Sequence, residues 1–270
     1  MEPSREHIKK CDRVVVKIGT TSLTYPNGRL NLRRIEAFCT VFSDLRNQGK
    51  EMILVTSGAI AVGADRLGLA ERPRDTLGKQ AASAVGQAML IQIYQQFFSR
   101  YNQEVAQILL TRDVIEIDER KQNARNTLFK LLSMGVIPLI NENDTVSTDE
   151  LGFSENDTLS AYVTVITESD LLINLTDKNG FYDSDPDIDP DAKIFHEIYE
   201  ITDEIEALAG ISQSRLGTGG MASKIAAAKL CAKHGIDTVV ASGEDPAVLW
   251  RILSGEREGT LFIADKRIKR

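Results

Sequence analysis

The sequence predicts an α/β fold with a parallel, doubly wound sheet, and three observations support this prediction. Short apolar runs alternate with longer segments whose apolar residues recur at helical spacing. The apolar runs end at glycine or at polar side chains, as buried parallel strands commonly do. The chain of 270 residues is long enough to bury a sizeable core in one large domain or two small ones. Alternating strands and helices then predict right-handed crossovers.

The composition excludes several classes of protein. Apolar residues make up 42% of the chain and charged residues 26%, as in an ordinary soluble globular protein. The net charge of −7 argues against a nucleic-acid surface, although a local basic pocket for phosphate is compatible with it. No apolar run is long enough to span a membrane, and the charged N-terminus lacks a secretory signal, so we expect a cytoplasmic protein. Scattered cysteines and histidines suggest neither a disulfide framework nor a zinc knuckle.

The first predicted strand is the apolar run from Arg13 to Gly19, which Lys17 interrupts. A lysine in a core strand is commonly an edge residue whose ammonium group reaches solvent. Lys17 also lies just before Gly19, near the carboxyl end of the strand, where open α/β sheets bind their ligands. The segment alone leaves both interpretations open.

A helix at 32–48 and a strand at 51–56 follow, and Ser57 comes directly after that strand. The segment from Ser57 to Gly63 combines a tight glycine turn with a helix of small residues. Ser57 is therefore predicted to be either a helix N-cap or a ligand contact.

The next predicted elements are one or two helices over 76–101, a strand at 105–110, a helix at 118–134 and a strand at 136–140. Four polar residues, Asn141 to Asp144, follow this fourth strand directly. Such side chains are costly to bury unless a group pairs with them, although a simple turn would also use Asn and Asp. Residues 145–155 have the composition of a hairpin or flap.

Polar residues also flank the fifth predicted strand, at 170–175. Asn156 and Asp157 precede a predicted helix at 158–163, which comes before this strand, and Asp157 could act simply as the N-cap of that helix. Thr176 and Asp177 follow the strand and place polar side chains at its carboxyl end.

Aspartates alternate through residues 183–191, but Ile188 stands where an EF-hand requires glycine. We therefore expect a solvated acidic loop at this position. A sixth strand at 237–241, a helix at 246–253 and an edge strand at 260–263 complete the predicted elements.

The glycine-rich stretch from Arg215 to Lys224 is the most informative segment of the chain. Three glycines within four residues precede a predicted helix that starts at Met221 and stops at Gly235. Unpaired amides and the helix dipole make such an N-terminus an anion site, and Lys224 adds a positive charge. A flexible linker before an ordinary helix is the alternative. A dinucleotide-binding role is disfavoured because residues 209–216 resemble a loop rather than a strand.

Together these features favour direct phosphoryl transfer. The chain combines two lysines with several glycine-rich turns, and it contains no Walker A sequence and no obvious histidine or cysteine nucleophile. In phosphoryl transfer, positioning and charge neutralisation supply most of the catalysis.

Six motifs resemble those of the amino-acid kinase family, in the family's order: VVVKIGTTSL, VTSGAIAVG, INENDTV, ENDTLSA, NLTDKNGFY and RLGTGGMASK. Within the family they are most similar to the members that phosphorylate glutamate. The resemblance implies a single domain, residues 1–270, folded as a three-layer αβα sandwich around a mainly parallel sheet. The amino acid would bind on the side formed up to about residue 165, and the nucleotide on the side formed by about 166–270. The resemblance also implies a dimer or a tetramer.

The activity that the resemblance implies is ATP-dependent phosphorylation of the γ-carboxylate of L-glutamate to L-glutamyl 5-phosphate, the first step of proline biosynthesis. Lys17 and Lys224 would stabilise the transferring phosphoryl group and the departing ADP oxygen, and Asp157 would hold both lysines by ion pairing. Mg2+ would bridge the ATP phosphates, with no metal-ligating residues assigned in the protein. A base is unnecessary because the carboxylate is already deprotonated at neutral pH.

The resemblance also implies which residues contact the substrates. The glutamate contacts would be Ser57, Asp144 and Asn156. The nucleotide contacts would be Lys17, Thr176, Asp177, Thr218, Gly219, Gly220, Met221 and Lys224.

The chain departs from the family pattern in two places. Many members have Gly-Asp-Asn-Asp where this chain has Ser154-Glu155-Asn156-Asp157, a change that bears on substrate affinity and on feedback inhibition by proline. Many bacterial members carry a C-terminal PUA domain, whereas we expect the kinase domain alone here. A glutamyl-phosphate reductase is the expected partner that consumes the product.

Two alternatives remain open. The first is another enzyme of the family, acting on acetylglutamate, aspartate, carbamate or uridylate. The second is a non-catalytic amino-acid sensor that kept the pocket, although the presence of Lys17, Asp157 and Lys224 argues against it.

Overall fold

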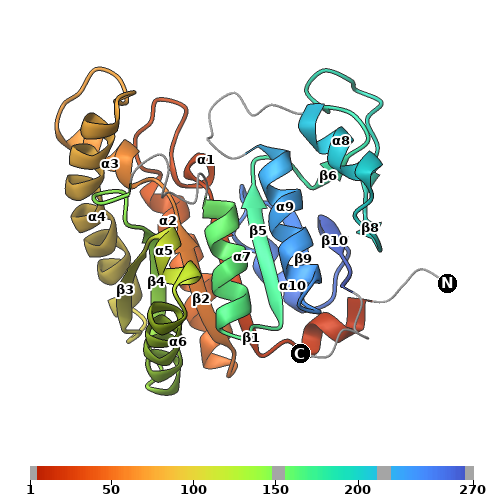
Figure 1. Ribbon diagram of the computed structural model, residues 1–270, viewed down its shortest axis with the longest axis horizontal. Coiled ribbons are helices and arrows are strands. Elements are labelled where there is room, and N and C mark those ends of the chain that lie inside the picture. The colour runs from red at the N-terminus through yellow and green to blue at the C-terminus, as the bar shows by residue number, and fades with distance from the viewer. Residues whose placement is uncertain (1–4, 148–155, 212–219, 265–270) are drawn as a thin grey trace.

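An eight-stranded sheet forms the centre of the computed structural model, which describes residues 5–147, 156–211 and 220–264 (Figure 1). The strand order across the sheet is β3-β4-β2-β1-β5-β9-β10-β8. The strands are β1 (Arg13–Ile18), β2 (Glu51–Thr56), β3 (Val105–Leu110), β4 (Ile137–Glu142), β5 (Leu171–Thr176), β8 (Glu197–Ile198), β9 (Asp237–Ser242) and β10 (Thr260–Phe262). A separate hairpin pairs β6 (Phe181–Tyr182) with β7 (Ile194–Phe195).

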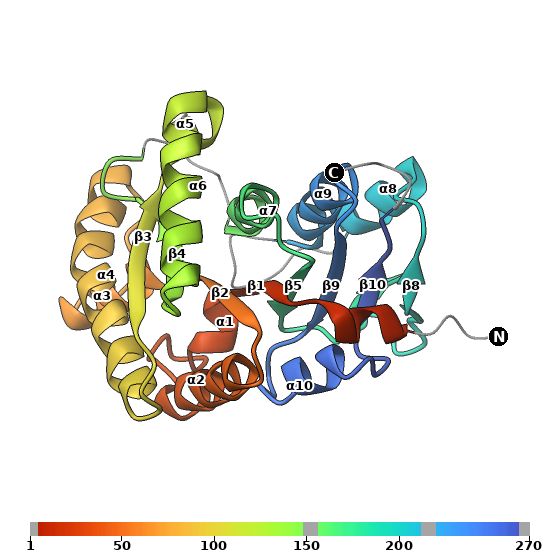
Figure 2. The ribbon, with the colours of Figure 1, turned by 90° about the horizontal axis from the view of Figure 1, so that it is seen from below.

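Helices cover both faces of the sheet, as Figure 2 shows. One face carries α6 (Asp118–Ser133), α7 (Asn156–Ile166) and α9 (Met221–Ala232), and the other carries α2 (Leu32–Asn47), α4 (Thr76–Ser99) and α10 (Val248–Leu253). The shorter helices are η1 (Arg5–Lys10), α1 (Thr20–Leu23), α3 (Ala59–Arg66), α5 (Arg112–Glu116) and α8 (Asp203–Ile211). The predicted αβα sandwich around a mainly parallel sheet is therefore confirmed.

Strand β1 lies near the middle of the sheet and pairs in parallel with β2 and β5. Its side chains alternate between the two faces because the side-chain period of a strand is two residues. Val14 and Val16 join the apolar cluster on the α2 face, whereas Val15 joins the cluster formed with α7. The same alternation places Lys17 on the α7 face, so Lys17 is a buried residue of a central strand and not an edge residue.

Helices α3 and α4 approach each other closely through two glycines. A Cβ atom on Gly63 would lie 1.7 Å from the carbonyl oxygen of Ala82, and one on Gly86 would lie 1.7 Å from that of Ala59. Only glycine at both positions permits this contact, since no side chain tolerates such distances. The contact fixes the start of α3, and with it the turn that follows β2.

Several predicted elements differ from the structure at the carboxyl-terminal edge of the sheet. Strand β10 was expected at the edge but lies between β9 and β8, antiparallel to β9. The edge is β8, whose two residues are too few to show a periodicity in the sequence. Residues 209–211 belong to α8 and are not a loop. The elements η1, α1, α5, β6, β7, β8 and α8 were not predicted from the sequence.

Some boundaries also differ. The N-cap of α3 is Gly58, with a left-handed φ of +103°, so Ser57 is not the cap. Asp157 lies inside the first turn of α7, which begins at Asn156, so it is not an N-cap either. Strand β4 extends through Glu142, and the segment from Thr76 forms one helix and not two.

None of the helices in the described ranges combines the length and the apolar character needed to cross a membrane.

Candidate active site

The centre of the candidate site is the carboxylate of Asp157, which is fully buried at the start of α7. Its Oδ1 atom lies 2.6 Å from Lys17 Nζ and accepts a hydrogen bond of 2.9 Å from Asn174 Nδ2. Its Oδ2 atom accepts hydrogen bonds from Ser223 Oγ at 2.6 Å and from Lys224 Nζ at 3.1 Å. Both predicted catalytic lysines therefore contact one carboxylate.

Four separate elements bring these groups together. Lys17 comes from β1, Asn174 from β5, Asp157 from α7, and Ser223 with Lys224 from the first turn of α9. The carboxyl ends of the parallel strands meet at one edge of the sheet, and the N-termini of α7 and α9 lie at the same edge (Figure 1). The sheet topology thus explains why residues distant in sequence share one site.

Because Asp157, Lys17 and Lys224 are buried, the electrostatic interactions between their charges are strong. Lys17 and Lys224 are only 5% and 4% exposed, and buried charges are costly unless they are paired. Burial by itself would raise the pKa of the Asp157 carboxyl, but the charges of Lys17 and Lys224 and the hydrogen bond from Ser223 outweigh it and hold that pKa well below its usual value. Asp157 is therefore an anion at neutral pH and cannot serve as a base there.

Asn156 links α7 to the ends of two strands. Its Nδ2 donates to Thr56 O at 3.1 Å, to Ser57 Oγ at 2.8 Å and to Asn141 Oδ1 at 2.9 Å. Its own Oδ1 atom is buried and has no hydrogen-bond partner in the described part of the chain. A buried acceptor without a partner is costly, so this oxygen suits a ligand that brings an N–H or O–H group.

Asp144 follows β4 at the same edge of the sheet. Its Oδ2 accepts a hydrogen bond of 2.7 Å from Ser83 Oγ on α4. Burial raises the pKa of the Asp144 carboxyl, while the hydrogen bond from Ser83 and the charge of Arg72 oppose that change. No hydrogen bond between described residues joins Asp144 to Ser57 or Asn156, so Asp144 shares an edge of the sheet with these two predicted contacts but is not part of their hydrogen-bond network.

The predicted nucleotide contacts lie at the ends of β5 and at the start of α9. Thr176 is buried and donates to Asp177 Oδ1 at 2.9 Å, while its carbonyl accepts from Gly243 N at 2.7 Å. Gly220 is the N-cap of α9. The side chain of Met221 packs in an apolar cluster with Phe181 and Ile225, so a contact from Met221 to a nucleotide would use its backbone.

Some predicted features lie outside the described residues. These are Thr218 and Gly219 of the nucleotide contacts, the Arg215–Gly217 part of the glycine-rich stretch, the departures Ser154 and Glu155, and the predicted flap from residue 148 onward.

Sequence reasoning missed three residues that the structure places in or beside the site, namely Asn174, Ser223 and Ser83. A signal existed for Asn174, because it is a polar residue inside an otherwise apolar strand, as Lys17 is in β1. Ser223 lies within the motif RLGTGGMASK, but no role was predicted for it. Ser83 had no distinguishing signal on a long helix.

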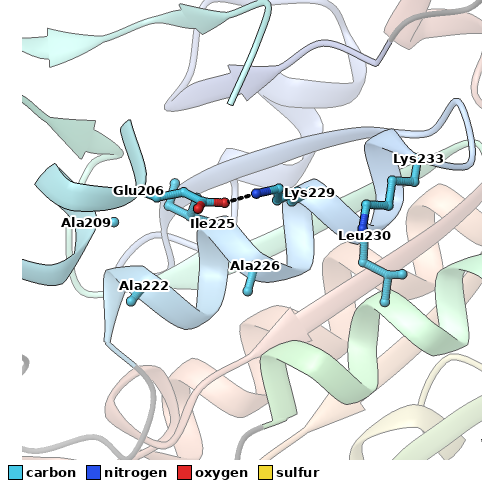
Figure 3. A pocket seen from close by; sticks show the side chains of 8 residues that line it. All are labelled: Glu206, Ala209, Ala222, Ile225, Ala226, Lys229, Leu230 and Lys233. Atoms are coloured by element: carbon cyan, nitrogen blue, oxygen red, sulfur yellow. Dashed lines mark hydrogen bonds and ion pairs between the residues drawn. The ribbon is translucent and has the colours of Figure 1, made fainter. Parts of the chain in front are cut away.

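A pocket of about 350 Å³ lies between α8 and α9, and Asp157 is not among its lining residues (Figure 3). An ion pair between Glu206 and Lys229 spans it. The lining residues are Glu206, Ala209, Ala222, Ile225, Ala226, Lys229, Leu230 and Lys233, none of which is a predicted site residue.

Fold and site together place the chain in a known class of phosphotransferases. The family model described as the amino acid kinase family matches residues 12–242. The chain therefore belongs to the amino acid kinase family.

Its similar relatives include the glutamate 5-kinases of several bacteria. It is 50% identical to the glutamate 5-kinase of Clostridium perfringens over 97% of this chain and 99% of that protein. It is 49% identical to the glutamate 5-kinase of Listeria monocytogenes serotype 4a, over 97% of this chain and 96% of that protein. The predicted resemblance to glutamate-directed members of the family is confirmed by these relatives.

Solved structures support the fold. A UMP kinase from Bacillus anthracis matches with a TM-score of 0.63 at 18% identity, over 94% of this chain and 97% of that one. A carbamate kinase from Giardia lamblia, bound to AMP-PNP, matches with a TM-score of 0.68 at 15% identity, over 95% of this chain and 100% of that one. At these identities the likeness concerns the fold alone.

Proposed function

We propose that the chain is a glutamate kinase that transfers the γ-phosphoryl group of ATP to the γ-carboxylate of L-glutamate. The products are ADP and L-glutamyl 5-phosphate, and the reaction is the first step of proline biosynthesis. The bacterial glutamate 5-kinases that are about half identical to this chain over 97% of its length support this activity. The structural observation that carries it is the convergence of Lys17 and Lys224 on the carboxylate of Asp157.

The two lysines would act on the charge that develops during transfer. The transferring group and the leaving ADP oxygen carry negative charge in the transition state, and fixed cations at those positions stabilise it more than the ground state. The ammonium groups of Lys17 and Lys224 are held by a buried partner, so they need little reorganisation when the reaction occurs. The γ-carboxylate is an anion at neutral pH and attacks the phosphorus without a base.

Asp157 would serve as the anchor for both lysines. Its low pKa keeps it ionised, and its two oxygens set the positions of the two ammonium groups on either side. In this role it does not exchange a proton with either substrate.

The glutamate contacts that we propose are Ser57, Asp144 and Asn156. The carboxylate of Asp144 and the unpartnered Oδ1 of Asn156 are acceptors, which suit the ammonium group of an amino acid. The Ser57 hydroxyl lies at the tip of β2 within reach of Asn156 and can donate to a carboxylate.

The nucleotide would bind on the other side of Asp157. Thr176 and Asp177 at the end of β5, and the backbone from Thr218 to Met221, would contact it, with the N-terminus of α9 directed at the phosphates. The twelve residues of α9 give that terminus a dipole suited to an anion.

Mg2+ is proposed as the metal that accompanies ATP. Within the described residues no group of three or more metal-binding side chains occurs. Mg2+ keeps several waters and is held largely by substrate phosphates, so the ATP phosphates themselves would be its principal ligands. When bound, Mg2+ neutralises charge on the β- and γ-phosphates.

Three further proposals concern partners. The product is an acyl phosphate, a reactive mixed anhydride, so we propose that a glutamyl-phosphate reductase consumes it. We also propose proline as a feedback inhibitor and a dimer or tetramer as the assembly, as the resemblance implies.

The test measures ADP release by the purified chain with ATP, Mg2+ and one acceptor at a time. L-Glutamate is compared with acetylglutamate, aspartate, carbamate and uridylate. Hydroxylamine added to the glutamate reaction traps an acyl phosphate as the hydroxamate, which shows that a carboxylate was phosphorylated. ADP release with glutamate no higher than with buffer would contradict the proposed acceptor.

A further inference from the structure

We propose that Asn174 is a positioning residue for phosphoryl transfer, because its carboxamide orients the Asp157 carboxylate that holds Lys17 and Lys224. Asn174 touches neither substrate in this proposal and acts through Asp157. The inference rests on the proposed function.

The position of Asn174 in β5 is unfavourable for an amide. Every residue of the strand is buried, and Asn174 is fully so. Asparagine is depleted in strands, and a buried carboxamide needs hydrogen-bond partners to offset its loss of hydration. A residue in such a place needs a compensating interaction, and among the described residues the side chain of Asn174 makes its hydrogen bond to Asp157.

The register of the sheet brings Asn174 beside Lys17. The two residues are partners across the parallel pair β1–β5, and two residues earlier the partners are Val15 and Leu172. Val15 and Leu172 belong to the apolar cluster with α7, so side-chain alternation points Lys17 and Asn174 toward α7 as well. Both then reach the same oxygen of Asp157, at 2.6 Å and 2.9 Å.

Asn174 supplies a kind of restraint that the lysines do not. The terminal torsion of an aspartate is broad, and lysine side chains are long and flexible. The short, planar amide of Asn174 projects from a central strand, so it fixes Oδ1 and thereby the plane of the carboxylate. It is also uncharged, so it orients Asp157 without competing with the ammonium groups for the transferring phosphate.

The carbonyl end of the Asn174 amide predicts an effect on the stability of the fold that can be separated from the effect on turnover. Asn174 Oδ1 is buried and has no hydrogen-bond partner among the residues that the structure describes. Replacing Asn174 by an apolar residue of similar size removes this unsatisfied acceptor together with the donor. The stability of the fold is then preserved or increased, while the orientation of Asp157 is lost.

The test compares Asn174→Leu and Asn174→Thr with the wild-type chain. Threonine suits a strand, but its hydroxyl is too short to replace the amide donor. We expect kcat to fall about tenfold in both variants, as for the loss of a hydrogen bond to a charged group, with KM for glutamate within about twofold. The melting temperature of Asn174→Leu is expected to stay level or rise.

Leu172→Val is the matched control, since Leu172 lies on the same strand and face and belongs to the apolar cluster with α7. It should lower the melting temperature and leave kcat within about twofold of wild type.

Several results would overturn the inference. One is a kcat for Asn174→Leu and Asn174→Thr within about twofold of wild type. Another is a loss of kcat that follows a matching loss of melting temperature, or failure of both variants to fold, because either would show a structural role. A wild-type chain without glutamate-dependent ADP release contradicts the proposed function instead. The variants are then compared with the acceptor that the wild type does phosphorylate.

Discussion

The ammonium groups of Lys17 and Lys224 lie against opposite oxygens of one buried carboxylate, although one comes from the first strand and the other from a helix near the end of the chain. Such an arrangement holds two positive charges at fixed positions in a site that is buried from solvent.

Replacing Lys224 by alanine should reduce turnover about a hundredfold or more, because a cation aimed at the transition state is lost. Lys229→Ala is the matched control, since Lys229 lies on the same helix but pairs with Glu206 on the outer side. ADP release at saturating substrates measures both variants, and circular dichroism checks that they fold. Unchanged turnover in Lys224→Ala would rule out its catalytic role.

Asp157→Asn should lower the free energy of unfolding by about 3 kcal/mol at neutral pH, since it leaves two buried lysines without their anion. The folded-state pKa of Asp157 is depressed, so its stabilising contribution is present above the ordinary aspartate pKa of about 3.9 and is lost as the pH falls through the folded value. The difference in the free energy of unfolding between Asp157→Asn and wild type, measured by urea titration, should therefore decrease only in strong acid.

The control for this experiment is Asp118→Asn, which removes an exposed pair with Lys121 and should leave the urea midpoint unchanged. Equal stability of Asp157→Asn and wild type at pH 7 would show that the buried cluster does not hold the fold together.

Ser83→Ala should move the acid limb of kcat/KM for glutamate to higher pH. The hydrogen bond from Ser83 lowers the pKa of Asp144, so its removal raises that pKa further. Asp144 then becomes protonated at a higher pH and loses its attraction for the substrate ammonium group. Ser133→Ala, which removes an exposed hydroxyl on α6, is the control, and an unmoved acid limb in Ser83→Ala would argue against Asp144 as a glutamate contact.

Gly63→Ala should lower the free energy of unfolding by about 2–3 kcal/mol, because the new methyl group meets the backbone of α4. The displaced α3 also shifts the turn at Ser57, so KM for glutamate should rise. Gly210→Ala is the contrasting variant, since nothing lies within 4 Å of a Cβ there, and it should add about 0.5 kcal/mol of stability. Thermal unfolding measures both, and equal effects would disprove the close helix contact.

The sequence was sufficient to predict the layers and the central strands, because their apolar runs and helical spacing are long enough to be read locally. The interruption of an apolar strand by Lys17 likewise drew attention to this residue, although the segment alone left an edge position and a ligand site equally open. Asn174 interrupts β5 in the same way, but its partner is set by strand register across the sheet, which no local pattern contains.

Other features escaped prediction for different physical reasons. Strand β8 has only two residues, and the place of β10 inside the sheet depends on how the chain returns after α10. The cap of α3 is a glycine with positive φ, while the neighbouring Ser57 has the more common capping side chain. Propensity alone favours the serine, and the backbone geometry of the turn decides otherwise.

The carboxylate of Asp157 takes its hydrogen-bond donors from β1, β5 and α9 while it sits on α7 itself. Catalytic activity therefore requires the complete tertiary structure, and no fragment that lacks one of these four elements retains it. During refolding, recovery of turnover should coincide with the packing of the last of these four elements into the fold, whichever segment of the chain forms first.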